Sequence, residues 1–115
     1  MLARSLPLAI LLATGHSFAL EPNQCAEVGT DSRGQTEIRN ACDKQISIAW
    51  CVDNPQSSFS CMPRRIAAAT LRPGAKTMAA YYKGESAGKQ IHWAVCLHPA
   101  VVMGWNGPGS RFDCR

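Results

Sequence analysis

Residues 35–50 read QTEIRNACDKQISIAW and contain two short runs in which apolar and polar side chains alternate, separated by the turn-like NACDK. A period of two places alternate side chains on one side of a pleated strand, so each run is a predicted β-strand. Together they predict a half-buried β-hairpin. Its predicted buried face carries four side chains: Ile38, Ile46, Ile48 and Trp50.

Four further strands are predicted over 63–72, 76–82, 90–97 and 101–105, with turns rich in Gly and Pro between them. The first of these, PRRIAAATLR, also suits a helix beginning at Pro63, but the Pro73-Gly74 that follows favours a strand ending in a turn. No segment has a long helical period. The sequence therefore predicts an all-β domain over residues 35–115, a small antiparallel β-sandwich or barrel of about six strands.

The N-terminus has the features of an export signal. Arg4 precedes the apolar run Leu6–Ala13, and Ser17-Phe18-Ala19 places small residues where a signal peptidase cleaves. We expect residues 1–19 to be a signal peptide, and the protein to be periplasmic or extracellular. The apolar run is shorter than the ~20 residues that cross a bilayer, so no transmembrane segment is expected.

Residues 20–34 are polar and show no apolar period, so they are predicted to form an extended N-terminal arm held by Cys25. The remaining chain of about 96 residues has the size of one domain, which excludes multi-domain catalysis and large cofactor folds. No cofactor is expected. The chain has 12 Lys and Arg against 8 Asp and Glu, a mild excess spread along its length, and no nucleic-acid-binding tract is indicated.

Six cysteines follow the predicted signal peptide. An even number in a short exported chain predicts three disulfides and an oxidising compartment. Fifteen connectivities are possible. Proximity in the sequence favours the pair Cys51–Cys61 first, and then Cys25–Cys42 and Cys96–Cys114. Closing the short loop between Cys51 and Cys61 contributes about 2.7 kcal/mol to the free energy of unfolding. No C-x-x-C pair is present, so the usual dithiol oxidoreductase motif is missing.

The stretch TEIRNACDKQISIAWC, Thr36–Cys51, followed by Cys61, resembles small exported bacterial cysteine-rich β-proteins with an Ile-x-Asn-x-Cys hairpin and a Trp-Cys on its second strand. The same 16 residues are locally similar to the opening of thaumatin-like proteins, but no acidic cluster here matches their acidic cleft. No functional residue carries over from either family. The resemblance implies a disulfide-tied β-domain.

Gly84-Glu85-Ser86-Ala87-Gly88 matches the G-x-S-x-G pattern of a nucleophile elbow, in which a strand-to-helix turn exposes the serine. Here a strand-like segment follows in place of the helix, and a Gly/Ser turn between two strands explains the same residues. No catalytic residue is predicted, and the chain is not expected to be an enzyme.

A copper site is a second candidate, because imidazole and thioether side chains suit that metal in an oxidising compartment. The residues in question are His92, His98, Met78 and Met103. Six residues of straight strand separate the histidines by about 20 Å, which is too far for one ion. No metal site is predicted.

Binding residues are predicted on loops and on one basic segment. Arg64, Arg65, Arg72 and Lys76 form the only local basic concentration, which is either a patch for anionic polymers or lipids, or a solvated face. Trp105 lies in the glycine-rich GWNGPGS, and Tyr81 precedes another loop. Aromatic side chains on loops are common recognition elements, although Trp105 could instead close the end of the sandwich. Trp50 and Trp93 are predicted core residues.

These features predict a small exported binding module that docks on an envelope or extracellular protein, with contacts at loops 52–60 and 104–110. Two alternatives remain open at this point. One is a carbohydrate- or surface-binding envelope protein with a glycan partner. The other is a compact hydrolase with a convergent Ser/His/Asp set.

Overall fold

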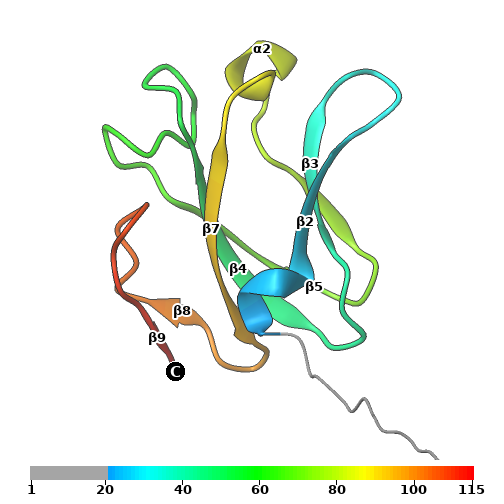
Figure 1. The fold of residues 1–115 in the computed structure, drawn as a ribbon, viewed down its shortest axis with the longest axis vertical. Helices are drawn as coiled ribbons and strands as arrows, with labels where there is room; N and C mark the ends of the chain where they lie inside the picture. Colours follow the sequence, from blue (N-terminus) through cyan, green and yellow to red (C-terminus); the bar gives the residue numbers. More distant parts are fainter. Residues whose placement is uncertain (1–20) are drawn as a thin grey trace, which may run out of the picture.

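The computed structural model describes residues 21–115, and the predicted signal peptide lies outside the described residues. Two three-stranded antiparallel sheets face each other across a shared core (Figure 1). One sheet has the order β2 (Ala26–Thr30), β3 (Thr36–Asn40), β6 (Lys76–Met78). The other has the order β5 (Ala67–Leu71), β4 (Ile46–Val52), β7 (Ile91–Leu97). The predicted all-β fold is confirmed.

Four smaller elements complete the described part of the chain. A short 3-10 helix, η2 (Pro22–Cys25), precedes β2, and a single helical turn, α2 (Lys83–Ser86), precedes β7. Near the C-terminus, β8 (Val102–Met103) pairs with β9 (Asp113–Cys114). Residues 21–115 therefore contain eight strands, against about six predicted.

The predicted hairpin is wrong, because its two strands belong to different sheets. Strand β3 pairs with β2 and β6, whereas β4 pairs with β5 and β7. The connection is organised by the fully buried side chain of Asn40, whose Nδ2 donates to the carbonyls of Lys44 (2.8 Å) and Leu71 (3.0 Å). Its Oδ1 accepts from the Cys42 N–H at 3.0 Å. These three hydrogen bonds turn the chain from one sheet into the other.

The predicted buried face is confirmed, since Ile38, Ile46, Ile48 and Trp50 all lie in the core between the sheets. Strand β4, however, is buried along its whole length on both faces. The C-terminal segment covers the outer face, where Ala49 and Cys51 pack with Trp105 in a second cluster. The expectation of a half-buried second strand is therefore wrong.

The predicted N-terminal arm belongs to the β-domain. Strand β2 pairs with β3 over its full length, from Ala26 opposite Asn40 to Thr30 opposite Thr36. Only the first residue of β2 is buried, so the strand shows no apolar alternation in the sequence. The domain boundary predicted at residue 35 is accordingly too late.

Three other strands are present but shorter than predicted. The strand over 63–72 is confirmed for Ala67–Leu71. The strand predicted over 76–82 ends at Met78. The next carbonyl, that of Ala79, accepts a hydrogen bond from Trp50 Nε1 (3.0 Å) and does not pair with the backbone of β3. The strand over 101–105 ends at Met103, where Gly104 adopts a positive φ of 80°.

The three disulfides join Cys25 to Cys42, Cys51 to Cys61 and Cys96 to Cys114, as proximity in the sequence predicts. The first ties η2 to the connection between the sheets. The second lies in the outer cluster, with Cys51 fully buried. The third fastens the C-terminal strand to β7.

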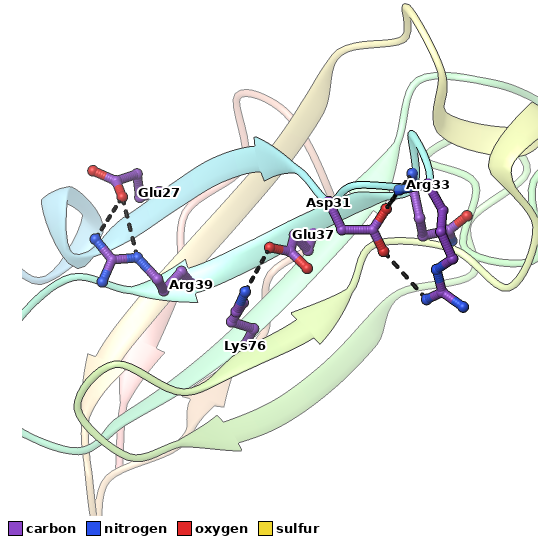
Figure 2. A network of polar contacts seen from close by, with 7 residues as sticks. Glu27, Asp31, Arg33, Glu37, Arg39 and Lys76 are labelled. Atoms are coloured by element: carbon purple, nitrogen blue, oxygen red, sulfur yellow. Dashed lines mark hydrogen bonds and ion pairs between the residues drawn. The ribbon is translucent and has the colours of Figure 1, made fainter.

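The outer surface of the β2-β3-β6 sheet is charged and carries cross-strand ion pairs (Figure 2). The pairs join Glu27 to Arg39 at 2.8 Å and Glu37 to Lys76 at 3.1 Å, and a local pair joins Asp31 to Arg33 at 3.2 Å. Exposed ion pairs of this kind contribute about 0–1 kcal/mol each. This face is a solvated surface, and the candidate site lies elsewhere.

Candidate functional site

A groove of about 480 Å³ runs beside β7 and is the first candidate for a binding site. In Figure 1 the C-terminal segment with β8 and β9 lies on one side of β7, and strands β2 and β3 lie on the other. The groove is lined by Ile91, His92 and Trp93 of β7, by Trp105 and Phe112 of the C-terminal segment, and by Asn23 of η2. Three aromatic side chains therefore meet polar groups in one concave surface, a composition typical of ligand sites.

The C-terminal wall of the groove is held by several independent bonds. The Cys96–Cys114 disulfide anchors it to β7, and Val101 and Arg115 exchange two backbone hydrogen bonds of 2.8 and 3.1 Å. The loop between Trp105 and Phe112 is closed by Ser110, whose Oγ accepts from the Asn106 N–H and donates to the Gly107 carbonyl, each at 2.8 Å. The C-terminal wall of the groove is therefore held in one conformation.

Trp105 is nine-tenths buried and packs against Ala49, Ala94 and the Cys51–Cys61 disulfide. Of the two roles that the sequence left open for Trp105, closing the end of the sandwich describes this packing. The same ring lines the groove. Trp105 therefore serves the outer core and shapes the site.

Asn23 attaches η2 to the edge of β7 through two contacts. Its Oδ1 accepts from the Val95 N–H at 2.7 Å, and its carbonyl accepts from Trp93 Nε1 at 2.9 Å. Trp93 is half-buried: it packs on the core, as predicted, and also lines the groove. The indole of Trp93 is consequently fixed in orientation.

His92 is the one described histidine in the groove, and its Nε2 lies 3.9 Å from Asp53 Oδ2. No hydrogen bond among residues 21–115 joins a serine hydroxyl to His92 or His98. Among residues 21–115, no serine hydroxyl is therefore hydrogen-bonded to the pair formed by His92 and Asp53. Chemically, the groove offers aromatic faces, amide groups and an imidazole.

The G-x-S-x-G segment has a structural role that the sequence does not reveal. Ser86 is 1% exposed, and its Oγ has no hydrogen-bond partner among the described residues. Its neighbour Glu85 binds the 54–58 loop: Oε1 accepts from the Ser58 N–H at 2.6 Å and from Ser57 Oγ at 3.1 Å. The Glu85 Oε2 accepts from the Tyr82 N–H at 3.1 Å. The segment connects α2 to that loop and presents no exposed serine.

The hydrogen bonds of Glu85 make a testable contribution to stability. Desolvation raises the pKa of Glu85, but the bonds from Ser58, Ser57 and Tyr82 outweigh it, so the pKa lies below its ordinary 4.5. The ionised group therefore stabilises the fold above pH 4.5, and this stabilisation is lost as the pH falls through the folded-state pKa. We expect Glu85→Gln to lower the free energy of unfolding by about 1–3 kcal/mol at pH 7.

Urea unfolding of both proteins between pH 3 and pH 7 measures this effect. The difference between them should shrink as the pH falls below 4.5. The control is Glu27→Gln, which removes an exposed ion pair and should stay within about 0.5 kcal/mol of the parent at pH 7. A constant difference across the whole pH range would contradict the role assigned to the Glu85 carboxylate.

The predicted basic patch is not assembled. Arg64 donates to Asn106 Oδ1 at 2.9 Å, beside the loop that forms the groove, and Arg65 donates to the Ser57 carbonyl at 3.4 Å. Arg72 lies beyond the opposite end of β5, a strand that spans about 16 Å. Lys76 is paired with Glu37. Arg64 and Arg65 thus lie at one end of β5 and Arg72 at the other, so the four charges do not form one continuous patch.

Tyr81 lies outside the groove. Its ring is 64% exposed and packs on Phe59, with centroids 5.0 Å apart. Both line a separate hollow of about 360 Å³ between β5 and β6, together with Trp50 and Met78. Of the predicted contact loops, 104–110 thus borders the groove, while the 52–60 loop contributes Phe59 to this other hollow.

Residues 21–115 contain no cluster of three His, Cys, Asp or Glu side chains arranged to hold a metal ion. Within the same residues, no helix is long and apolar enough to span a membrane. Comparison with known proteins adds no relative: no family model, no curated protein and no solved structure matches the chain.

Several residues that line the groove were not predicted as site residues, among them Asn23, His92 and Phe112. Asn23 contacts Val95, 72 positions away, and no local pattern indicates such a contact. The position of Phe112 near a cysteine could have indicated its place in the groove. It lies two residues before Cys114, and the favoured Cys96–Cys114 pairing places it beside β7. His92 follows Ile91 in a strand, where the alternation alone gives it no special role.

Proposed function

We propose that this chain is a small exported binding module that docks on an envelope or extracellular protein through the groove beside β7. The groove itself carries the proposal, because it joins Trp93, Trp105 and Phe112 on a framework fixed by three disulfides. Aromatic side chains held rigidly in a concave site dominate binding energy in protein recognition. Export is supported by the pairing of all six cysteines, which requires an oxidising compartment.

A glycan ligand is the second candidate, because Asn23 and Gln24 place amide groups beside the indoles. Amides can bond hydroxyl groups while an aromatic face packs against a ring. The two candidates differ in the ligand and share the groove. One experiment therefore tests the site, and its probes separate the ligand classes.

The test uses the secreted, oxidised protein with two probes, a phage-displayed heptapeptide library and a panel of soluble oligosaccharides. We expect Phe112→Ala, which removes a half-buried groove side chain, to weaken the best-binding probe about 30-fold. Tyr81→Ala removes an exposed aromatic outside the groove and is the matched control; its affinity should change less than about 2-fold.

Thermal unfolding of both variants tests whether they remain folded. Binding that survives Phe112→Ala but is lost in Tyr81→Ala would move the site to the hollow between β5 and β6. Failure of both probes to bind would overturn the proposed function.

A further inference from the structure

Strand β7 is the last strand of its sheet, and its outer edge forms part of the groove. Backbone groups of successive residues point alternately toward and away from the neighbouring strand. The Gln90 carbonyl accepts from Asp53 N–H and the His98 N–H donates to the Gln45 carbonyl, so the even-numbered residues face β4. The odd-numbered Val95 N–H instead points outward, to Asn23 Oδ1. Ile91 and Trp93 therefore also direct their N–H and C=O outward.

Within residues 21–115, these outward groups have no hydrogen-bond partner in the half of the strand that contains Ile91 and Trp93. The Val95 N–H donates to Asn23 Oδ1, so Asn23 occupies the outer edge of β7 at Val95. Beyond that point, no hydrogen bond outside the β4–β7 ladder involves the backbone of Ile91 or Trp93 within residues 21–115. Both residues line the groove. Among the described residues, the backbone N–H and C=O groups of Ile91 and Trp93 are thus free in the groove, which is the arrangement that allows another strand to pair.

We propose that the groove binds an extended segment of a partner protein, which adds to β7 as a fourth strand of the β5-β4-β7 sheet. This inference rests on the proposed function and names its ligand. The free groups of Ile91 and Trp93 are two residues apart, about 6.6 Å along the strand, which is the repeat of an extended backbone. In such strand addition the backbone bonds supply affinity and alternate side chains supply specificity.

The groove walls predict the side chains of the segment. Residues of an added strand alternate between the two faces of the sheet. On the outer face they reach Trp105 and Phe112, and on the inner face they reach Trp93. Apolar side chains are therefore expected at successive central positions of the segment, with Asn23 marking the position where pairing stops.

Charge favours an acidic partner segment over a second copy of this basic chain. Exposed Lys89 lies two residues before Ile91, and exposed Arg111 lies between the lining residues Ser110 and Phe112. Neither forms an ion pair among the described residues. The chain carries a net charge of +4, which disfavours self-association through this edge. The occupant is thus an extended segment with apolar central residues and acidic ends.

The test uses the tightest heptapeptide selected from the phage library, synthesised with single N-methyl groups at each position. Methylation should weaken binding about 10-fold at alternate positions, whose N–H groups face β7. At the intervening positions, affinity should change less than about 2-fold. Hydrogen exchange of the Ile91 and Trp93 amides should slow at least 10-fold in the complex. The amide of Val28, on strand β2, is the control and should not change.

The outcomes separate this inference from the proposed function. A peptide that needs Phe112 but shows no alternation on methylation and no protection of Ile91 and Trp93 would overturn strand addition and retain the groove as the site. Binding of an oligosaccharide in place of every peptide would also overturn it in favour of a glycan ligand. Concentration-dependent dimerisation that protects the same two amides would assign the edge to a second copy of the chain and overturn it as well.

Discussion

Reduction of the three disulfides is expected to unfold this protein at room temperature. The reduced protein should therefore show no cooperative unfolding transition on heating. A disulfide closing a short loop contributes about 2–4 kcal/mol, whereas a small domain has a total free energy of unfolding of about 5–15 kcal/mol. Losing three bridges removes most of that margin in a domain of about 96 residues. Calorimetry of the oxidised protein, and of protein reduced and alkylated, measures the effect.

The positions of the bridges predict their ranking when each is replaced by two alanines. Cys51–Cys61 should be the most costly to remove, because Cys51 is fully buried and the bridge packs under Trp105. Cys96–Cys114 should cost less, since Cys114 is exposed. Six reactive thiols in the native protein, or reduction that leaves the thermal midpoint unchanged, would contradict the disulfide framework.

Trp105→Ala is expected to lower the free energy of unfolding by about 3–5 kcal/mol. The indole is nine-tenths buried against the Cys51–Cys61 bridge, Ala49 and Ala94, so its removal leaves a cavity between β4 and the C-terminal segment. Trp50→Ala, in the core between the sheets, should cost a similar amount. Urea unfolding of both variants makes the comparison.

The matched control for Trp105→Ala is Tyr81→Ala, an aromatic truncation at a side chain that is 64% exposed. It should change the stability by less than about 1 kcal/mol. A Trp105→Ala protein as stable as the Tyr81→Ala protein would show that Trp105 belongs to a loop surface, with no role in the outer core.

Much of the candidate site depends on contacts between distant residues. The sequence indicates Trp105 and its loop, because an aromatic among glycines is recognisable locally. It does not indicate that Asn23 meets Val95, or that Trp93 and Trp105 line one groove from different layers of the fold. Arg64 and Arg72 show the opposite error. They are close in sequence, but β5 separates them.

The sequence indicated the all-β class and the buried face of Ile38, Ile46, Ile48 and Trp50. Among fifteen possible connectivities, short spacing only favoured the three disulfide pairings that the structure contains. Alternation of apolar and polar residues indicates which side chains of a strand are buried. Short spacing between cysteines favours disulfides between neighbours in the sequence. Only the folded chain shows that β3 and β4 belong to different sheets, that β2 is a strand, and that the outer edge of β7 has no partner strand among residues 21–115. Strand pairing is made by backbone groups common to every residue, so the alternation of side chains does not specify which strand is the partner.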